Sequence, residues 1–125
     1  MHLLVVAATE GELASLDTGP SAVRCRVDVL VTGVGMVATA AHVARALART
    51  RFDLALNIGV CGAFDRTLPL GTVVHVTTER ISELGVEDGR TFLPADTIGL
   101  VSPDEAPFTG GCLVNATPPV SAVIE

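Results

Sequence analysis

The sequence is poor in aromatic residues, with four phenylalanines and no tryptophan or tyrosine among its 125 residues. Val, Leu, Ile and Ala must therefore pack the interior, and hydrophobic residues make up 49% of the chain. That proportion argues against disorder. It is typical of a buried parallel sheet flanked by alanine-rich helices, and the length suffices for one domain with one core.

Basic residues are also scarce: eight Lys and Arg face fourteen Asp and Glu, for a formal net charge of −6. This balance argues against a nucleic-acid partner, because phosphate binding needs clustered basic side chains. No window approaches a membrane span, and the apolar start of the chain is too short for a signal peptide. We therefore expect neither a nucleic-acid nor a membrane partner.

The three cysteines, Cys25, Cys61 and Cys112, are odd in number and far apart, and no C-x-x-C pair occurs. The pattern indicates neither a zinc site nor a disulfide framework. We expect a cytoplasmic protein without a metal ion or another cofactor.

Apolar and β-branched runs alternate with one long helical segment. The alternation predicts an α/β fold with a mainly parallel or mixed central sheet and flanking helices. The predicted strands are residues 3–8, 24–32, 54–58 and 72–78, with a short helix near Leu13 and Leu16 and a longer one over 36–50. The longer helix is expected to bury one apolar face, formed by Val37, Ala40, Ala41, Ala44, Leu47 and Ala48.

The signal fades after residue 78. Residues 79–89 are acidic and glycine-rich, residues 91–108 contain three prolines, and a further strand could begin at Gly110. The apolar run 120–124 stands directly before the last residue, an unusual place for a strand. We expect residues 1–125 to be a single α/β domain whose C-terminal part is missing.

Gly33-Val34-Gly35-Met36-Val37-Ala38 matches the G-x-G-x-x-A form of the dinucleotide fingerprint. That fingerprint also expects an acid at the carboxyl end of the next strand. Asp53 has a suitable spacing but stands at the beginning of its strand. Two other interpretations stay open, a tight turn for close helix packing and the lining of another small-molecule pocket.

The segment Asn57-Ile58-Gly59-Val60-Cys61-Gly62 follows the third predicted strand. Gly59 and Gly62 lack a Cβ, so the backbone there could adopt positive φ and let a ligand contact it directly. Ligands of open α/β sheets collect at this edge. No histidine accompanies Cys61 in the sequence, which favours a small pocket wall over a nucleophile.

Thr9-Glu10-Gly11-Glu12 follows the first strand and has two interpretations. Thr9 and Glu12 could form a capping box. Alternatively, the Glu12 carboxylate could face the mouth formed by the glycine turns and activate a water molecule. The two are compatible only if the carboxylate swings away from the cap. His42 and His75 have no neighbouring acid or cysteine, which favours structural roles.

Three segments together resemble the purine nucleoside phosphorylase and nucleosidase superfamily: LVVAATEGE (4–12), TGVGMVA (32–38) and NIGVCG (57–62). In detail they look most like the futalosine hydrolases of the menaquinone pathway, and residues 64–71 and 83–89 add to that likeness. The methylthioadenosine nucleosidase branch is similar but usually carries a basic residue where Met36 stands.

The resemblance implies hydrolysis of the N-glycosidic bond of futalosine, a purine nucleoside derivative, with release of hypoxanthine. It makes Glu12 the carboxylate that positions and deprotonates the water. It places Val60, Cys61 and Gly62 along the purine and ribose. Thr9 and Val34 match positions near the sugar and its 5′ substituent.

The superfamily's second half carries an aspartate that protonates the purine and a Met-Glu pair for the ribose hydroxyls, and neither lies in residues 1–124. Alternatives are a truncated, non-catalytic purine-binding or assembly module, a methylthioadenosine or S-adenosylhomocysteine nucleosidase, or a phosphorylase. A phosphorylase would need basic residues such as Arg24 or Arg66, and a dinucleotide oxidoreductase is a more distant alternative. An exposed apolar sheet edge leads us to expect a homo-oligomer.

Overall fold

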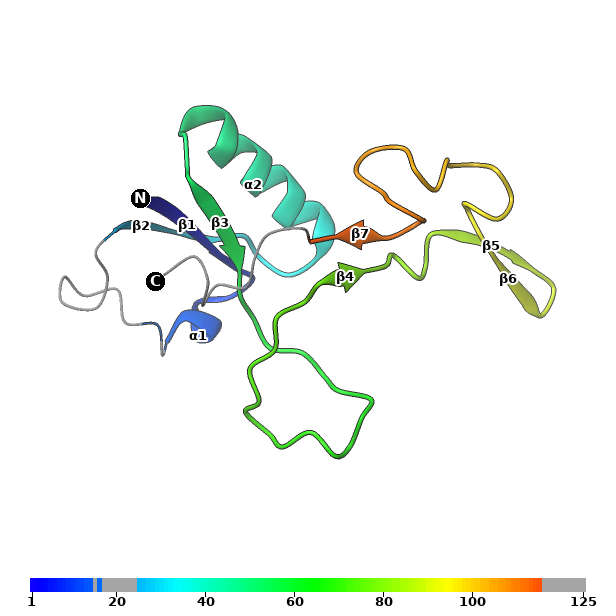
Figure 1. The fold of residues 1–125 in the computed structure, drawn as a ribbon, viewed down its shortest axis with the longest axis horizontal. Coiled ribbons are helices and arrows are strands. Elements are labelled where there is room, and N and C mark those ends of the chain that lie inside the picture. The colour runs from blue at the N-terminus through cyan, green and yellow to red at the C-terminus, as the bar shows by residue number, and fades with distance from the viewer. Residues whose placement is uncertain (15, 17–24, 116–125) are drawn as a thin grey trace. The chain divides into compact units, whose positions relative to one another are not determined.

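The computed structural model describes residues 1–14, 16 and 25–115. The chain divides into two compact units, Met1–Arg66 and Thr67–Glu125 (Figure 1). The expectation of one domain over residues 1–125 stays a prediction, because two compact units can together form one domain. The apolar run 120–124 lies outside the described residues.

The first unit contains a three-stranded parallel sheet, in the order β2-β1-β3 (Figure 1). Its strands are β1 (His2–Ala7), β2 (Arg26–Val31) and β3 (Leu54–Asn57). Val5 of β1 pairs with Val29 on one side and Leu56 on the other. These strands fall within two residues of the first three predicted ones, and they confirm the α/β class with a parallel sheet.

The core of this unit is β1 itself. Leu3, Leu4, Val5, Val6 and Ala7 are all buried. An unbroken apolar run is what a central parallel strand requires, because such a strand is covered on both faces and flanked on both edges. The two outer strands contain only half-buried and exposed positions, which alternate in β3. Glu12 follows this buried central strand, at the carboxyl edge of the sheet.

Helix α2 (Met36–Arg49) connects β2 to β3 and has the predicted extent, but it packs through a different face. Its half-buried side chains are Ala38, Thr39, His42, Val43 and Ala46, which recur at helical spacing. The predicted face, Val37, Ala40, Ala41, Ala44, Leu47 and Ala48, is exposed, so that prediction was wrong. The polar residues of this helix, Thr39, His42, Arg45 and Arg49, lie on one side, so the helix is amphipathic. The half-buried face overlaps that polar side through Thr39 and His42, and the apolar periodicity therefore indicated the wrong face.

The short helix α1 (Glu10–Leu13) begins two residues after β1. It is a single turn, which is short as predicted but ends before Leu16. Because the three strands are parallel, α1, the glycine turn after β2 and the segment after β3 all leave the sheet at one edge. Hydrogen bonds from Thr32 N to Ala7 O (3.0 Å) and from Ile58 N to Val6 O (2.9 Å) continue the pairing to that edge.

The second unit contains two small antiparallel pairs, β4 (Thr78–Glu79) with β7 (Leu113–Val114) and β5 (Gly85–Asp88) with β6 (Thr91–Pro94). A full strand over 72–78 was therefore wrong. Among the described residues, the range 72–78 pairs with another segment only near its own end, where Asn115 N donates a hydrogen bond to Thr77 O (2.9 Å). The strand expected to begin at Gly110 is reduced to two residues.

The β5–β6 hairpin was not predicted, although the sequence carries a signal for it. The two-residue loop Gly89-Arg90 connects Asp88 of β5 to its partner Thr91 of β6. Gly89 has a φ of 64°, which is the left-handed conformation that short hairpin loops require at their first position. The glycine directly after Asp88 was therefore more informative than the acidic composition around it.

Candidate active site

The Glu12 carboxylate lies at the carboxyl edge of the sheet and is held by donors from two segments. Thr9, the N-cap of α1, donates from its backbone nitrogen (2.9 Å) and its Oγ1 (3.1 Å) to Oε2 of Glu12. Val60, just after β3, donates from its backbone nitrogen to Oε1 (3.2 Å). One carboxylate thus connects the segment after β1 with the segment after β3.

This geometry corrects one expectation from the sequence. A capping box and a carboxylate facing the glycine segment were expected to exclude each other unless the side chain swung away. Both occur together, because Oε2 of Glu12 serves the cap at Thr9 while Oε1 reaches Val60. A carboxylate has two oxygens and about four lone-pair positions, so the cap does not exhaust it.

These hydrogen bonds also favour the ionised form of Glu12. The backbone N–H of Thr9 has the largest effect, followed by that of Val60, and together they hold the pKa of the Glu12 carboxyl below its ordinary value of 4.5. Donors aimed at a carboxylate favour its ionised form. At neutral pH the site therefore presents a fixed anion that can accept a hydrogen bond or a proton from a water molecule.

The remaining predicted residues lie along the same edge, and most are open to solvent. Val60 is 86% exposed, and the free thiol of Cys61 and Gly62 are exposed beside it in the chain. Val34 follows β2 on the other side of β1 and is 81% exposed. The hydrogen bonds of the described residues bring Thr9, Glu12 and Val60 together. The functional roles of all six predicted site residues stay predictions.

The glycine turn after β2 is fixed by two threonines that the sequence analysis passed over. Thr32 is buried (4% exposed), and its Oγ1 lies 3.0 Å from Oγ1 of Thr39 on α2 and 3.0 Å from Gly33 O. Gly33 and Gly35 have φ of 81° and 104°, a region that only glycine enters readily. The available signal in the sequence was a threonine on either side of the glycine turn.

Positive φ is not used where the sequence analysis expected it. Gly33 and Gly35 adopt it, but Gly59 and Gly62 do not. The space beside Gly59 is instead occupied by Glu12, whose Oε1 would lie 2.8 Å from a Cβ built there. The need for a small residue at this position is therefore steric.

Asp53 does not lie where a dinucleotide site would need it. It immediately precedes β3, and its Oδ2 accepts a hydrogen bond from the backbone nitrogen of His2, at the first residue of β1 (2.6 Å). That places it at the amino edge of the sheet, opposite the glycine turn. Its role is to join the beginnings of two strands.

Within the residues that the structure describes, no group of three or more His, Cys, Asp or Glu side chains is arranged to hold a metal ion. A separate observation concerns the helices. None in the described ranges is both long and apolar enough to cross a bilayer.

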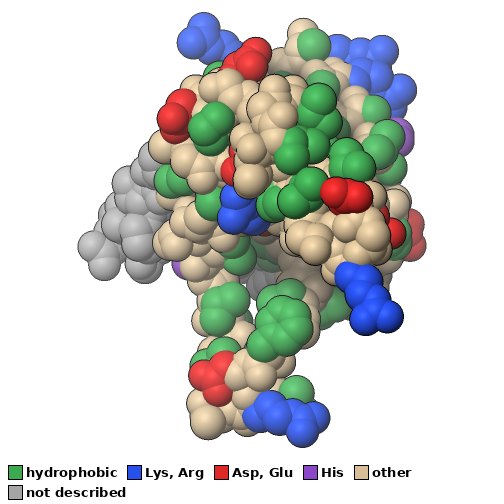
Figure 2. Space-filling view, turned by 90° about the vertical axis from the view of Figure 1, so that its right-hand side faces the viewer, with side chains coloured by type: hydrophobic (Ala, Val, Ile, Leu, Met, Phe, Trp, Pro, Cys, Tyr) green, Lys and Arg blue, Asp and Glu red, His purple; other side chains and the backbone are tan. Residues whose placement is uncertain are grey.

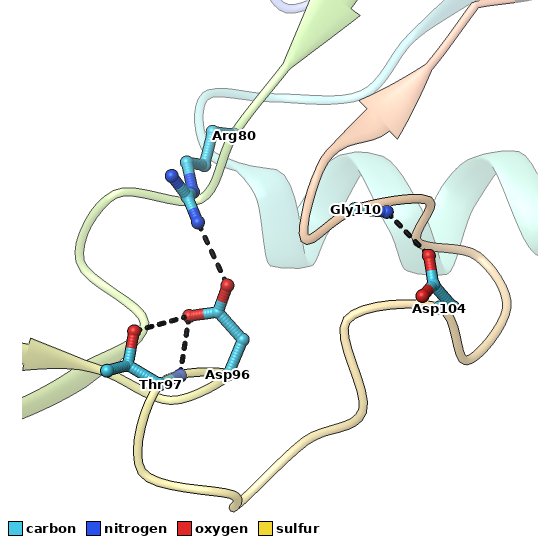
Figure 3. A network of polar contacts seen from close by, with 5 residues as sticks. All are labelled: Arg80, Asp96, Thr97, Asp104 and Gly110. Carbon is cyan, nitrogen blue, oxygen red and sulfur yellow. Dashed lines mark hydrogen bonds and ion pairs between the residues drawn. The ribbon is translucent and has the colours of Figure 1, made fainter.

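The second unit contains a cavity of about 190 Å³ with apolar walls that include Leu84, Phe92, Val101 and Phe108. At its rim, Arg80 Nη2 lies 2.9 Å from Asp96 Oδ2, while Asp96 Oδ1 accepts from Thr97 N (2.9 Å; Figure 3). Nearby, Asp104 Oδ1 accepts from Gly110 N (2.8 Å; Figure 3). The side chains of Arg80, Asp96 and Asp104 thus bond to one another or to nearby loop backbone. Glu12, in the first unit, lies instead at an open edge of the sheet.

Comparison with known proteins adds the family. Residues 21–117 match the family model described as the phosphorylase superfamily. The match covers more than half of the chain. This chain belongs to the phosphorylase superfamily. No curated protein and no solved structure matches it.

Membership in the phosphorylase superfamily assigns the chain to nucleoside-processing enzymes that transfer or hydrolyse glycosyl groups. The parallel sheet with its crossover helix agrees with a nucleoside phosphorylase-like fold. The matched range includes Val34 and the segment Val60–Gly62, whereas Thr9 and Glu12 precede it. The contact between Glu12 and Val60 therefore joins a residue outside the matched range to one inside it.

Proposed function

We propose that this protein hydrolyses the N-glycosidic bond of a purine nucleoside derivative, and that the substrate is futalosine, with hypoxanthine as the released base. The observation that carries the proposal is the position of the Glu12 carboxylate, held at 3.2 Å by the Val60 N–H at the sheet edge. The sequence resemblance described above favours futalosine over other nucleosides.

In this reaction a water oxygen attacks C1′ of the ribose, and the bond from C1′ to the purine nitrogen breaks. The electron pair of that bond leaves with the purine, and the proton of the water passes to Glu12. The sugar carries positive charge in the transition state, so a fixed anion nearby stabilises it as well as orienting the water. The purine then takes up a proton, and Glu12 returns its own to solvent.

The substrate contacts in this proposal follow the edge of the sheet. Val60, Cys61 and Gly62 lie along the purine and ribose, and Thr9 and Val34 lie near the sugar and its 5′ substituent. The exposure of Val60 and Val34 supports this role, because both side chains are open to an incoming ligand. Protonation of the leaving purine is assigned to none of the described residues. The absence of such an acid typically lowers a rate on the order of 10²–10⁴-fold.

The experiment is incubation of the protein with futalosine, with and without inorganic phosphate, followed by chromatography of the bases and sugars. Release of hypoxanthine and a free sugar without phosphate is expected. A rate that depends on phosphate, with a sugar phosphate as product, would identify a phosphorylase. Tight hypoxanthine binding without turnover would identify a purine-binding module.

We also propose that copies of the chain associate. Large hydrophobic side chains are exposed on its surface, among charged ones of both signs (Figure 2). On α2, Met36 and Val37 are more than half exposed, and Leu47 is about half exposed. Exposed apolar surface of this kind favours contact with another protein surface. Sedimentation equilibrium distinguishes an oligomer from a monomer.

A further inference from the structure

The backbone of Gly59 passes directly beneath the Glu12 carboxylate. A Cβ at this position would lie 2.8 Å from Oε1 and 3.5 Å from Cδ of Glu12. Real Cβ atoms do not approach other heavy atoms at 2.8 Å, so a side chain of any size here conflicts with the observed carboxylate position. Among the described residues, Glu12 supplies the only atoms within 4 Å of that Cβ, apart from the chain neighbours of Gly59.

We propose that Gly59 is a positioning residue for Glu12: its missing side chain leaves the space in which Oε1 lies and thereby lets the carboxylate reach the Val60 N–H. The catalytic consequence of this inference rests on the proposed function. The positioning itself does not, since it concerns only contacts within the protein.

The backbone conformation of Gly59 does not explain the glycine. Its φ is outside the left-handed region, in contrast to Gly33 and Gly35, so alanine could adopt the same backbone without strain. Gly62 provides the comparison three residues later. It also lacks a positive φ, and a Cβ there would meet no described atom within 4 Å.

The conflict at Gly59 involves the far end of a flexible side chain and not the backbone. A methyl group would therefore displace the Glu12 carboxylate more readily than it would disturb the sheet. Oε2 can stay on Thr9 while Oε1 rotates away from Val60, which removes one of the donors that favour the ionised form. Because Val60 is exposed, water can satisfy its released N–H.

The test is an NMR titration of the side-chain carboxyl of Glu12 in ¹³C-glutamate-labelled protein, assigned by its loss in Glu12→Gln. In Gly59→Ala we expect the pKa of Glu12 to rise toward its ordinary value of 4.5. In the matched control Gly62→Ala we expect no change. An unchanged pKa in Gly59→Ala, or equal shifts in both variants, would overturn the inference.

If Gly59→Ala fails to fold, the double variant Gly59→Ala with Glu12→Ala decides the question. Removal of the Glu12 side chain abolishes the conflict, so the double variant is expected to fold, and its failure to do so would overturn the inference. With futalosine hydrolysis established, kcat in Gly59→Ala should fall by roughly 10²-fold while KM changes less, since misplacement of a reacting group by about 1 Å has this effect. Absence of hydrolysis in the unmodified protein would count against the proposed function and leave the titration result standing.

Discussion

Oε1 of Glu12 accepts a hydrogen bond from the backbone nitrogen of Val60, 48 residues along the chain, at 3.2 Å. This contact closes the edge of the sheet between the segments that follow β1 and β3. It depends on the parallel order of the strands, which brings their carboxyl ends to one side. Glu12 therefore connects distant parts of the sequence and also takes part in a local helix cap.

The pH dependence of the reaction follows from the direction of the Glu12 pKa shift. In the proposed reaction the ionised carboxylate is the base, and the donors from Thr9 and Val60 hold its pKa below 4.5. As pH falls, kcat/KM for hypoxanthine release should therefore stay constant down to pH 4.5 and decline only at lower pH. An acid limb above 4.5 that disappears in Glu12→Gln would contradict the depressed pKa.

The same shift has a consequence for stability. A carboxyl group whose pKa is lower in the folded than in the unfolded chain stabilises the fold above its unfolded pKa. This contribution is lost as pH falls through the folded pKa.

Replacement of Thr9 by valine should weaken the cap of α1 and remove one hydrogen bond to the Glu12 carboxylate. The change removes the Oγ1 donor at 3.1 Å but retains the backbone N–H at 2.9 Å. We expect the pKa of Glu12 to rise and the free energy of unfolding to fall by about 1 kcal/mol, the usual effect of losing an N-cap side chain. Urea denaturation and carboxyl titration measure the two effects. Thr9→Ser retains the hydroxyl and is expected to resemble the unmodified protein, so equal losses in both variants would contradict this account.

Gly35→Ala tests the turn after β2. Gly35 has a φ of 104°, and a Cβ there would meet no described atom within 4 Å, so the expected effect is one of backbone conformation alone. We expect a loss of about 1–3 kcal/mol in the free energy of unfolding, measured by urea denaturation. Gly62→Ala, which adds a methyl group in equally open space at ordinary φ, should be nearly neutral. Equal stabilities of the two variants would show that the turn tolerates alanine.

Two valines on α2 test which face of the helix packs against the sheet. Val43 is half-buried, whereas Val37 is 80% exposed. Val43→Ala should lower the free energy of unfolding by about 1 kcal/mol, since it removes partly buried methyl groups. Val37→Ala should stay within about 0.5 kcal/mol of the unmodified protein. The reverse order would indicate that the face predicted from the sequence is the buried one.

The parallel sheet could be predicted because its strands are defined by local composition. The run 3–7 is apolar without interruption, and such a run has few alternatives to a central strand. The run 72–78 is much richer in β-branched residues, yet the described structure pairs it only near its end. Strand propensity is local, but a strand exists only beside a partner, and the sequence does not reveal that partner.

The sequence indicated Thr9, Glu12 and Val60 as candidate residues but not the geometry that joins them. The spacing of Thr9 and Glu12 indicated a capping box, and their place after a strand indicated a functional edge. Only the structure shows that one carboxylate serves both, because the second contact comes from Val60, far along the chain. The reason for glycine at position 59 was likewise assigned to backbone freedom, whereas a neighbouring side chain explains it.

The central claim is that the Glu12 carboxylate activates water for cleavage of a nucleoside. The most direct measurement compares kcat/KM for hypoxanthine release from futalosine in the unmodified protein, in Glu12→Gln and in Glu10→Gln. Glu10 lies on the same helical turn and is exposed, so its variant controls for the loss of one charge. We expect Glu12→Gln to lose on the order of 10²–10⁴-fold and Glu10→Gln to keep its rate. Equal rates in all three proteins would contradict the role of Glu12.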